Sequence, residues 1–210
     1  MRMITQIDPF KSAPTLSNED AVQIVKIVAP AVLLPHPDVV SQFDGPVWPV
    51  VRNGKKRYTH NEERTLVYDD NMLARWALLW SHGIVQTGFP SGWTVAHVWA
   101  DPKESTSFTN LANLALMPEY FGSLSDKNGP LAVFLRWHSS AVYGWQPKDA
   151  GGRSLPLPKA PQGFDEISWH YFEPIHESKD VVSAVLAKSN SKAATTLKYV
   201  LSQLSEHSLK

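Results

Sequence analysis

Residues 92–116 read GWTVAHVWADPKESTSFTNLANLAL, and this stretch decides the fold that we predict for the chain. It begins with an apolar, β-branched run that leads to His97 and continues through a polar segment into a second apolar run. Apolar, β-branched runs are typical of strands, and polar residues between two such runs are typical of a connecting loop. We therefore predict a strand over 93–99 and a second strand or extended segment over 108–116.

The residues that follow predict two helices. A short helix is expected to begin near Pro118, because proline suits the first helical turn. A longer helix is expected to begin at Pro130 and to end at Gly144. The predicted order between 93 and about 127 is therefore strand, loop, extended segment and short helix. His138 lies on the apolar face of the longer helix, and we expect it to be a core histidine with a hydrogen-bond partner.

Two further helices are predicted upstream. One follows Ser17, a cap residue with Asp20 three positions further on. The other follows the possible cap Asp70-Asn71 and carries His82 in its last turn. A carbonyl group or the helix dipole accounts for a histidine at that position.

The pair Asn53-Gly54 lies between two β-prone runs and predicts a hairpin, because both residues accept the positive φ of a tight turn. Basic residues gather at the tip of this hairpin. They are Arg52, Lys55, Lys56 and Arg57. The cluster is a candidate for contacts with phosphate, and a solvated turn is the alternative.

The predicted elements include both helices and strands, and we predict a mixed α+β domain. We predict a core α+β domain over 1–146 and a linker or surface arm, rich in proline and glycine, over 147–163. A strand and C-terminal helices are predicted over 164–210. Those helices either pack on the core or join two copies in a homo-oligomer.

Composition restricts the classes of function. The chain has 20 basic and 20 acidic residues, so no overall field attracts nucleic acid and any such site must be a local patch. The absence of cysteine excludes disulfides and thiolate-bound zinc and favours a hard ion such as Mg²⁺. No segment approaches the roughly 20 apolar residues that span a bilayer, and the N-terminal residues lack the apolar core of a signal peptide. We therefore expect a soluble, cytoplasmic protein with no membrane partner.

Segment 93–128 resembles the HNH endonuclease family. The resemblance rests on Ala96-His97-Val98, which matches the apolar-flanked first histidine of the family, and on NLANLAL (110–116), which matches its asparagine-leucine segment. It implies a central ββα-metal finger-like motif within a mixed domain with flanking helices. It also implies hydrolysis of phosphodiester bonds in DNA with a divalent ion.

The resemblance assigns roles to individual residues. His97 would be the general base that takes a proton from water, and Asn110 or Asn113 would orient its ring. Asp126 and Glu119 are the candidate ligands of Mg²⁺ or another divalent ion, which would neutralise charge on the phosphate. The candidate phosphate-binding residues are the hairpin-tip cluster together with Lys127 and Arg136.

The segment departs from the family pattern at three points, one of which is the absence of the zinc-binding cysteine pairs that family members commonly carry around the finger. Ala96 stands just before the first histidine, where family members often have a second metal ligand, and residues 117–129 contain no histidine. The alternative is a non-catalytic nucleic-acid-binding or protein-interaction module with a degenerate HNH-like fold. A further alternative is that the asparagines only cap a turn and that His97 bonds a carbonyl in a tryptophan-rich core.

The sequence lacks the motifs of other hydrolases and of nucleotide-dependent enzymes. The eight histidines show no H-E-x-x-H spacing, and no G-x-S-x-G elbow accompanies them. A P-loop and a G-x-G-x-x-G fingerprint are also absent from the sequence.

Overall fold

The structure is a computed structural model that describes most of the chain between residues 16 and 187. The described ranges are 16–48, 50–52, 59–60, 66–68, 71–85, 91–99, 106–126, 129–149, 152–157 and 159–187.

The described residues form a mixed α+β fold, as the sequence predicts. The helices are α1 (Asn18–Val28), α2 (Pro37–Val40), α3 (Met72–Trp80), α4 (Gly122–Ser125), α5 (Pro130–Tyr143) and α6 (Ser178–Ala187). The strands are β1 (Leu33–Leu34), β2 (Val50–Arg52), β3 (Thr59–His60), β4 (Leu66–Tyr68), β5 (Trp93–His97), β6 (Leu114–Pro118) and β7 (His170–Tyr171). Short 3₁₀ helices are η1 (Ala29–Ala31), η2 (Leu111–Asn113), η3 (Glu119–Phe121) and η4 (Phe164–Glu166).

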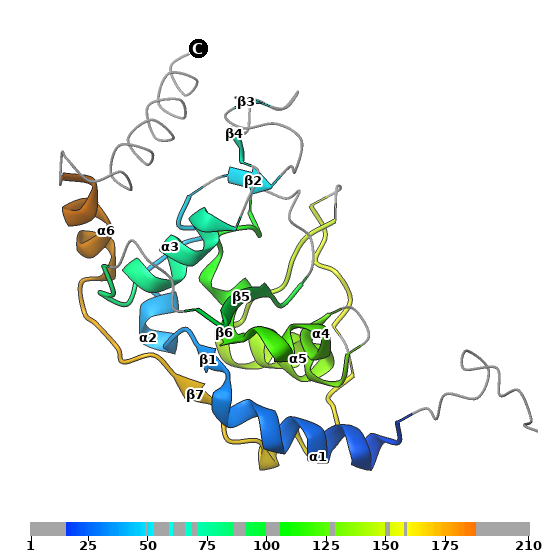
Figure 1. Cartoon of the computed structure of the whole chain (residues 1–210). Coiled ribbons are helices and arrows are strands. Elements are labelled where there is room, and N and C mark those ends of the chain that lie inside the picture. The colour runs from blue at the N-terminus through cyan, green and yellow to red at the C-terminus, as the bar shows by residue number, and fades with distance from the viewer. Residues whose placement is uncertain are drawn as a thin grey trace, which may run out of the picture.

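Four strands form one mixed sheet in the order β5-β6-β1-β7 (Figure 1). β5 and β6 are antiparallel along their full length, from Trp93 opposite Pro118 to His97 opposite Leu114. β1 pairs antiparallel with β6 and parallel with β7. β5 is therefore an edge strand, and the last residue of this edge is His97.

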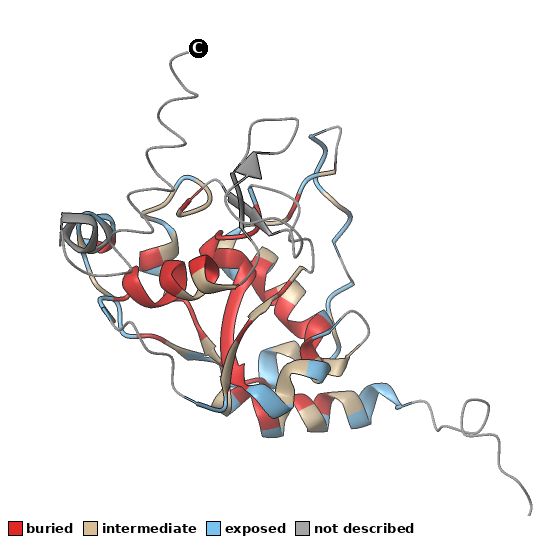
Figure 2. Cartoon of the chain, turned by 45° about the horizontal axis from the view of Figure 1, so that its top comes forward, coloured by how far each residue is buried: buried red, intermediate tan, exposed pale blue. Residues whose placement is uncertain are grey.

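The sheet is the middle layer of the fold. On one face, Leu114 and Leu116 of β6 belong to a cluster with the apolar side chains of α3; on the other, Ala115 and Met117 belong to a cluster with α1 and α5. Successive side chains of a strand point to opposite faces, so the continuous apolar run of β6 serves both clusters. Figure 2 shows the buried residues along the sheet and on the helix faces turned towards it.

The predicted helix boundaries follow from local chemistry. At α1, the Ser17 hydroxyl accepts a hydrogen bond from the Asp20 amide at 3.1 Å, and the Asp20 carboxylate accepts one from the Ser17 amide. This reciprocal cap is the one the sequence predicts. At α5, Pro130 opens the helix and Gly144 ends it with φ 65°, which confirms the predicted helix.

The predicted hairpin around Asn53-Gly54 is wrong. β2 pairs in parallel with β4, and β3 pairs antiparallel with the same strand, so β4 lies between the two strands that were expected to pair. Local turn propensity favours adjacent strands but does not exclude a third strand from the position between them. The turn itself lies outside the described residues.

The second strand of the central stretch begins later than predicted. β6 begins at Leu114, because the three residues before it, Leu111–Asn113, form a 3₁₀ turn that Asn110 caps. The strand then extends to Pro118, and η3 and α4 follow directly as the predicted short helical segment.

The C-terminal part of the described chain joins the same sheet. Between 147 and 163, an isolated bridge joins Lys148 to Ser154, and the other described residues have no strand pairing or helix. β7 then pairs with β1, and α6 packs against α3. The helices predicted beyond residue 187 lie outside the described residues. Within the described ranges, no helix is both long and apolar enough to cross a membrane.

Candidate active site

His97 occupies the last position of the edge strand β5. Its imidazole Nε2 lies 2.9 Å from the carbonyl oxygen of Phe108, and the two rings are stacked with centroids 5.1 Å apart. Phe108 is fully buried, whereas His97 is partly buried. The histidine ring is therefore held from the core side while its strand lies at the sheet edge.

The contact with Phe108 fixes the protonation pattern of the ring. A backbone carbonyl can only accept a hydrogen bond, so Nε2 carries the hydrogen. In the neutral imidazole, Nδ1 is then the basic nitrogen.

Asn113 fastens the loop between the two strands. Its side chain is fully buried; Oδ1 accepts a hydrogen bond from the Trp99 amide at 2.8 Å, and Nδ2 donates one to the Ser107 carbonyl at 2.9 Å. Nδ2 also lies 3.4 Å from the Trp99 carbonyl oxygen. The side chain thereby joins both ends of the loop that separates His97 from Phe108.

Asn110 caps the 3₁₀ turn before β6. Its Oδ1 accepts a hydrogen bond from the Ala112 amide at 3.0 Å. The resemblance predicted that Asn110 or Asn113 would orient His97. Instead, the Phe108 carbonyl holds Nε2, and the asparagine hydrogen bonds described here go to the backbone.

A cleft of about 510 Å³ brings His97 together with both carboxylates that the sequence proposed as metal ligands. Glu119 comes from η3 and Asp126 directly follows α4, and both side chains are exposed. β6 runs antiparallel to β5 and returns the chain to the start of η3. Glu119 and Asp126, which lie 22 and 29 positions after His97 in the sequence, therefore share one cleft with it. The sequence separation of these residues did not by itself require this proximity.

Asn71 is a cleft residue that the sequence assigned only to a helix cap. It stands at the N-cap position of α3, yet its side chain makes no capping hydrogen bond. Oδ1 is buried and has no hydrogen-bond partner within the described part of the chain, and Asn71 lines the same cleft as His97. A buried amide oxygen without a hydrogen-bond partner is unusual in proteins, so this oxygen is a candidate to bind a ligand or a water molecule.

The donor set of the cleft fits a hard divalent ion. Two carboxylates and an amide oxygen without a partner are the ligand types that Mg²⁺ and Ca²⁺ prefer. Among the described residues, no three His, Asp or Glu side chains are close enough together to hold a metal by themselves. The fit therefore depends on the combination of Glu119, Asp126 and Asn71 with water or substrate oxygens.

The proposed phosphate-binding residues are described only in part. Arg136 donates a hydrogen bond from Nε to the Val98 carbonyl at 3.3 Å, and its guanidinium carbon lies 5.5 Å from the centroid of the Trp99 ring. It therefore braces the residues just after His97 and does not line the cleft. Of Arg52, only the backbone is described; Lys55, Lys56, Arg57 and Lys127 lie outside the described residues.

Two other histidines have structural environments. His82 accepts a hydrogen bond at Nε2 from the His36 amide and donates one from Nδ1 to the Leu78 carbonyl, as its place in the last turn of the predicted helix suggested. His138 is buried in the core and lies 2.7 Å from the Tyr171 hydroxyl. Burial lowers the pKa of each to about 4, so both rings are neutral at pH 7.

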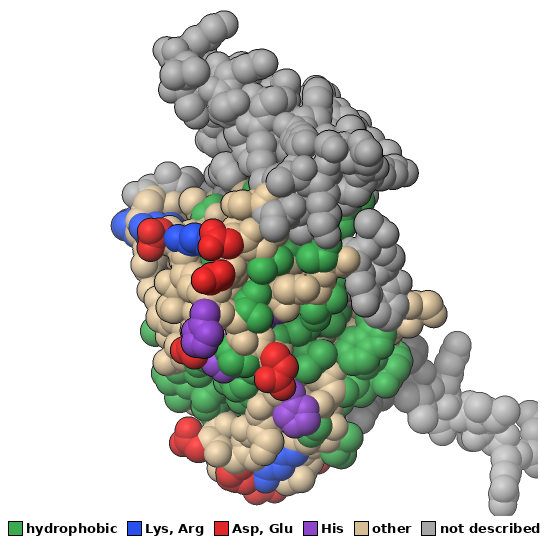
Figure 3. Space-filling view, turned by 90° about the vertical axis from the view of Figure 1, so that its left-hand side faces the viewer, with side chains coloured by type: hydrophobic (Ala, Val, Ile, Leu, Met, Phe, Trp, Pro, Cys, Tyr) green, Lys and Arg blue, Asp and Glu red, His purple; other side chains and the backbone are tan. Residues whose placement is uncertain are grey.

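The face of the molecule on the side of α6 carries apolar patches beside polar surface. Figure 3 shows hydrophobic side chains over much of it, with acidic side chains and histidines between them and few Lys or Arg among the described residues. A phosphate backbone is bound by clustered cations. Among the described residues, this face carries few such cations, and no Lys or Arg lines the cleft beside β5.

Comparisons with models of known protein families, with curated proteins and with solved structures found no match.

Proposed function

We propose that the cleft beside β5 hydrolyses phosphodiester bonds in DNA, with His97 as the general base and a divalent ion held by Glu119 and Asp126. The observation that carries the proposal is the hydrogen bond from His97 Nε2 to the Phe108 carbonyl on the wall of a cleft that also holds both carboxylates. The order of β5, β6 and the short helix α4 supports a ββα-metal arrangement for these residues.

In the proposed reaction, a water molecule attacks the phosphorus atom. The water oxygen forms a bond to phosphorus, one ester bond from phosphorus breaks, and Nδ1 of His97 receives the proton of the water. The departing alkoxide takes a proton from solvent. The Phe108 carbonyl stabilises the imidazolium that forms, because it accepts the hydrogen bond from Nε2 in both charge states.

The remaining residues position these groups. Asn113 holds the loop and so fixes Phe108 relative to His97. Glu119, Asp126 and the Asn71 oxygen would hold the ion, which when bound supplies charge neutralisation at the phosphate and at the departing oxygen. Arg136 acts through Val98, the neighbour of His97, as a positioning residue.

A plasmid-nicking assay tests the proposal. Supercoiled DNA is incubated with the full chain in Mg²⁺ or Mn²⁺, and the formation of open circles is followed over time. We expect ion-dependent nicking that a chelator stops. The variant His97→Gln keeps an amide N–H for the Phe108 carbonyl but has no basic nitrogen, and we expect it to be slower by at least about 100-fold.

The matched control is His170→Gln, since His170 is exposed on β7 and does not line the cleft. It should nick at the wild-type rate. Intact plasmid with the wild-type chain in both ions, or undiminished nicking by His97→Gln, rules the proposal out. Binding of DNA without cleavage would favour the non-catalytic alternative.

A further inference from the structure

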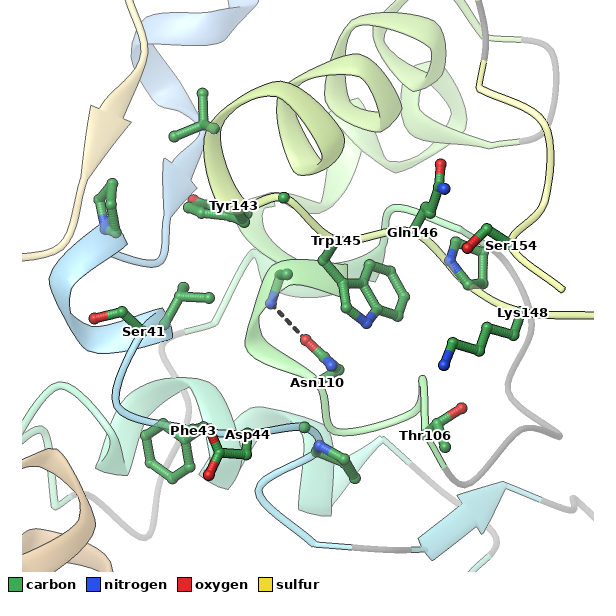
Figure 4. Close-up of a pocket in the computed structure, with 18 residues that line it drawn as sticks. Ser41, Phe43, Asp44, Thr106, Asn110, Tyr143, Trp145, Gln146, Lys148 and Ser154 are labelled. Atoms are coloured by element: carbon green, nitrogen blue, oxygen red, sulfur yellow. Dashed lines mark hydrogen bonds between the residues drawn. The ribbon is translucent and has the colours of Figure 1, made fainter. Parts of the chain in front are cut away.

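A second cavity lies beside the turn at Asn110, two residues after Phe108. Its volume is about 580 Å³, and its walls come from α2, the loop after α2, the turn at Asn110 and the residues that follow α5. This volume lies within the range of small-molecule sites, roughly 300–1,000 Å³. Figure 4 shows Tyr143, Trp145 and Lys148 on one side of the cavity and Phe43 and Asp44 on the opposite side.

Asn110 presents a hydrogen-bond donor to this cavity. The residue is only 4% exposed, and its Oδ1 is already used by the Ala112 amide. Within the described part of the chain, no hydrogen bond engages Nδ2, and Figure 4 shows the amide group in the space between Trp145 and Asp44. An amide that is almost fully buried therefore directs its donor at the cavity.

Two further donors face the same space. In Figure 4, the nitrogen edge of the Trp145 indole is turned towards Asn110, and the amine end of Lys148 points into the cavity from the strand-like segment after α5. An indole N–H and an ammonium group can only donate, so together with the Asn110 amide they require an acceptor. The cation makes an anionic acceptor the best match.

We propose that this cavity binds a small organic phosphate of mononucleotide size. The phosphate oxygens accept from Asn110 Nδ2, Trp145 Nε1 and Lys148 Nζ. The organic part fills the remaining volume between Phe43 and Trp145, two aromatic side chains on which a flat ring can lie. Asp44, at the end opposite Lys148, accepts a hydrogen bond from a hydroxyl or amino group of the ligand.

This site is distinct from the cleft beside β5. The two cavities share no lining residue, and a connection between them runs through the backbone, since Phe108 holds His97 and Asn110 lies two residues further on. The proposal therefore does not depend on hydrolysis at His97. Binding of an organic phosphate can be measured whether or not the chain cuts DNA.

Isothermal titration calorimetry with the full chain tests the site, with adenosine 5′-monophosphate as the probe. Adenosine, inorganic phosphate and citrate are titrated separately, to separate recognition of the ring, the phosphate and a carboxylate. We expect one molecule of the monophosphate per chain and binding of adenosine that is at least about tenfold weaker, because the charge-assisted hydrogen bonds are lost.

Two variants remove the donors. Asn110→Asp keeps an oxygen for the Ala112 amide but replaces the donor Nδ2 with a second, negatively charged oxygen. Lys148→Met removes the cation from an exposed position. Each should weaken binding of the monophosphate at least about tenfold. Lys159→Met, at an exposed lysine that does not line the cavity, and His97→Gln should bind within about twofold of wild type.

Circular dichroism establishes whether Asn110→Asp is folded; if it is not, Lys148→Met decides. The proposal is overturned if the monophosphate does not bind at millimolar concentration, if adenosine binds equally well, or if both variants retain wild-type affinity. Tighter binding of citrate than of the monophosphate would overturn the assignment to phosphate.

Discussion

At the scale of single residues, the geometry around His97 depends on Asn113. Its amide satisfies the Trp99 amide and the Ser107 carbonyl, and no water-exposed surface remains on it. Asn113→Ala would leave both backbone groups without these partners. We expect a loss of about 2–4 kcal/mol in the free energy of unfolding, measured by urea denaturation.

Gln23→Ala is the control for this experiment, because Gln23 is exposed on α1. It should change the free energy of unfolding by no more than about 0.5 kcal/mol. An equally small effect of Asn113→Ala would mean that the loop does not depend on this side chain.

The buried histidines predict a dependence of stability on pH. Burial lowers the pKa of His138 from 6.5 to about 4 in the folded chain, so the unfolded chain binds the proton first as the pH falls. His138 therefore supports stability fully above about pH 6.5, and this contribution is lost as the pH falls towards 4. His82 acts in the same direction for the same reason.

His138→Gln removes one of these titrating groups. Between pH 7 and about pH 4.5, its free energy of unfolding should fall by about 2–3 kcal/mol less than that of the wild type. The measurement is a series of urea denaturation curves across this range. His170→Gln, at an exposed position, is the control and should keep the wild-type pH dependence. Parallel curves for wild type and His138→Gln would contradict the burial argument.

The sequence predicts His97, Glu119 and Asp126 as site residues, and the structure places them around one cleft. The sequence did not identify the Phe108 carbonyl, because every residue carries a carbonyl group and its direction is set by the fold. It also assigned Asn71 to a helix cap, because a cap and a ligand oxygen have the same signature in sequence.

At the scale of elements, the end of α5 depends on the left-handed conformation of Gly144. Its φ is 65°, and an added Cβ would meet no atom within 4 Å, so only backbone strain opposes a side chain there. Gly144→Ala should lower the free energy of unfolding by about 1 kcal/mol. Thermal and urea denaturation measure this change.

Gly122 is the matched control in the same chain. It also has open space at the Cβ position, but it is helical, with φ −52°. Gly122→Ala should be neutral or should stabilise by up to about 1 kcal/mol. Equal effects at Gly144 and Gly122 would show that the left-handed conformation does not determine the cost.

The predicted elements differ in how much local information defined them. The sequence predicts α1 and α5 well, because residues next to their ends mark them. Ser17 and Asp20 cap the start of α1, and Pro130 and Gly144 mark the start and the end of α5. The hairpin was predicted wrongly, since strand pairing depends on segments far apart in sequence. The position of β4 between β2 and β3 depends on tertiary contacts, and the residues of the turn do not determine it.

At the scale of the whole molecule, β6 connects two cores. Leu116 faces the cluster with α3, and Met117 faces the cluster with α1 and α5, so neither cluster can lose the strand without disturbing the other. We expect urea to unfold both clusters in one transition, with coincident curves from far-UV circular dichroism and tryptophan fluorescence. Separate transitions would show that the two clusters are independent.

The layered arrangement was only partly readable from the sequence. The continuous apolar run before Pro118 indicated a strand, but its burial on both faces depends on helices from distant parts of the chain. β7 has only two residues and was predicted as a longer strand, since pairing with β1 defines its length.

The central claim is that the imidazole of His97 acts as the base in phosphodiester hydrolysis, and chemical rescue tests it most directly. His97→Gly removes the ring, and imidazole is added to the nicking assay with Mg²⁺ or Mn²⁺. We expect the variant to be slower than wild type by at least about 100-fold and added imidazole to restore nicking at least about tenfold. The claim is contradicted if the wild-type chain leaves the plasmid intact in both ions, or if His97→Gly without imidazole nicks as fast as wild type.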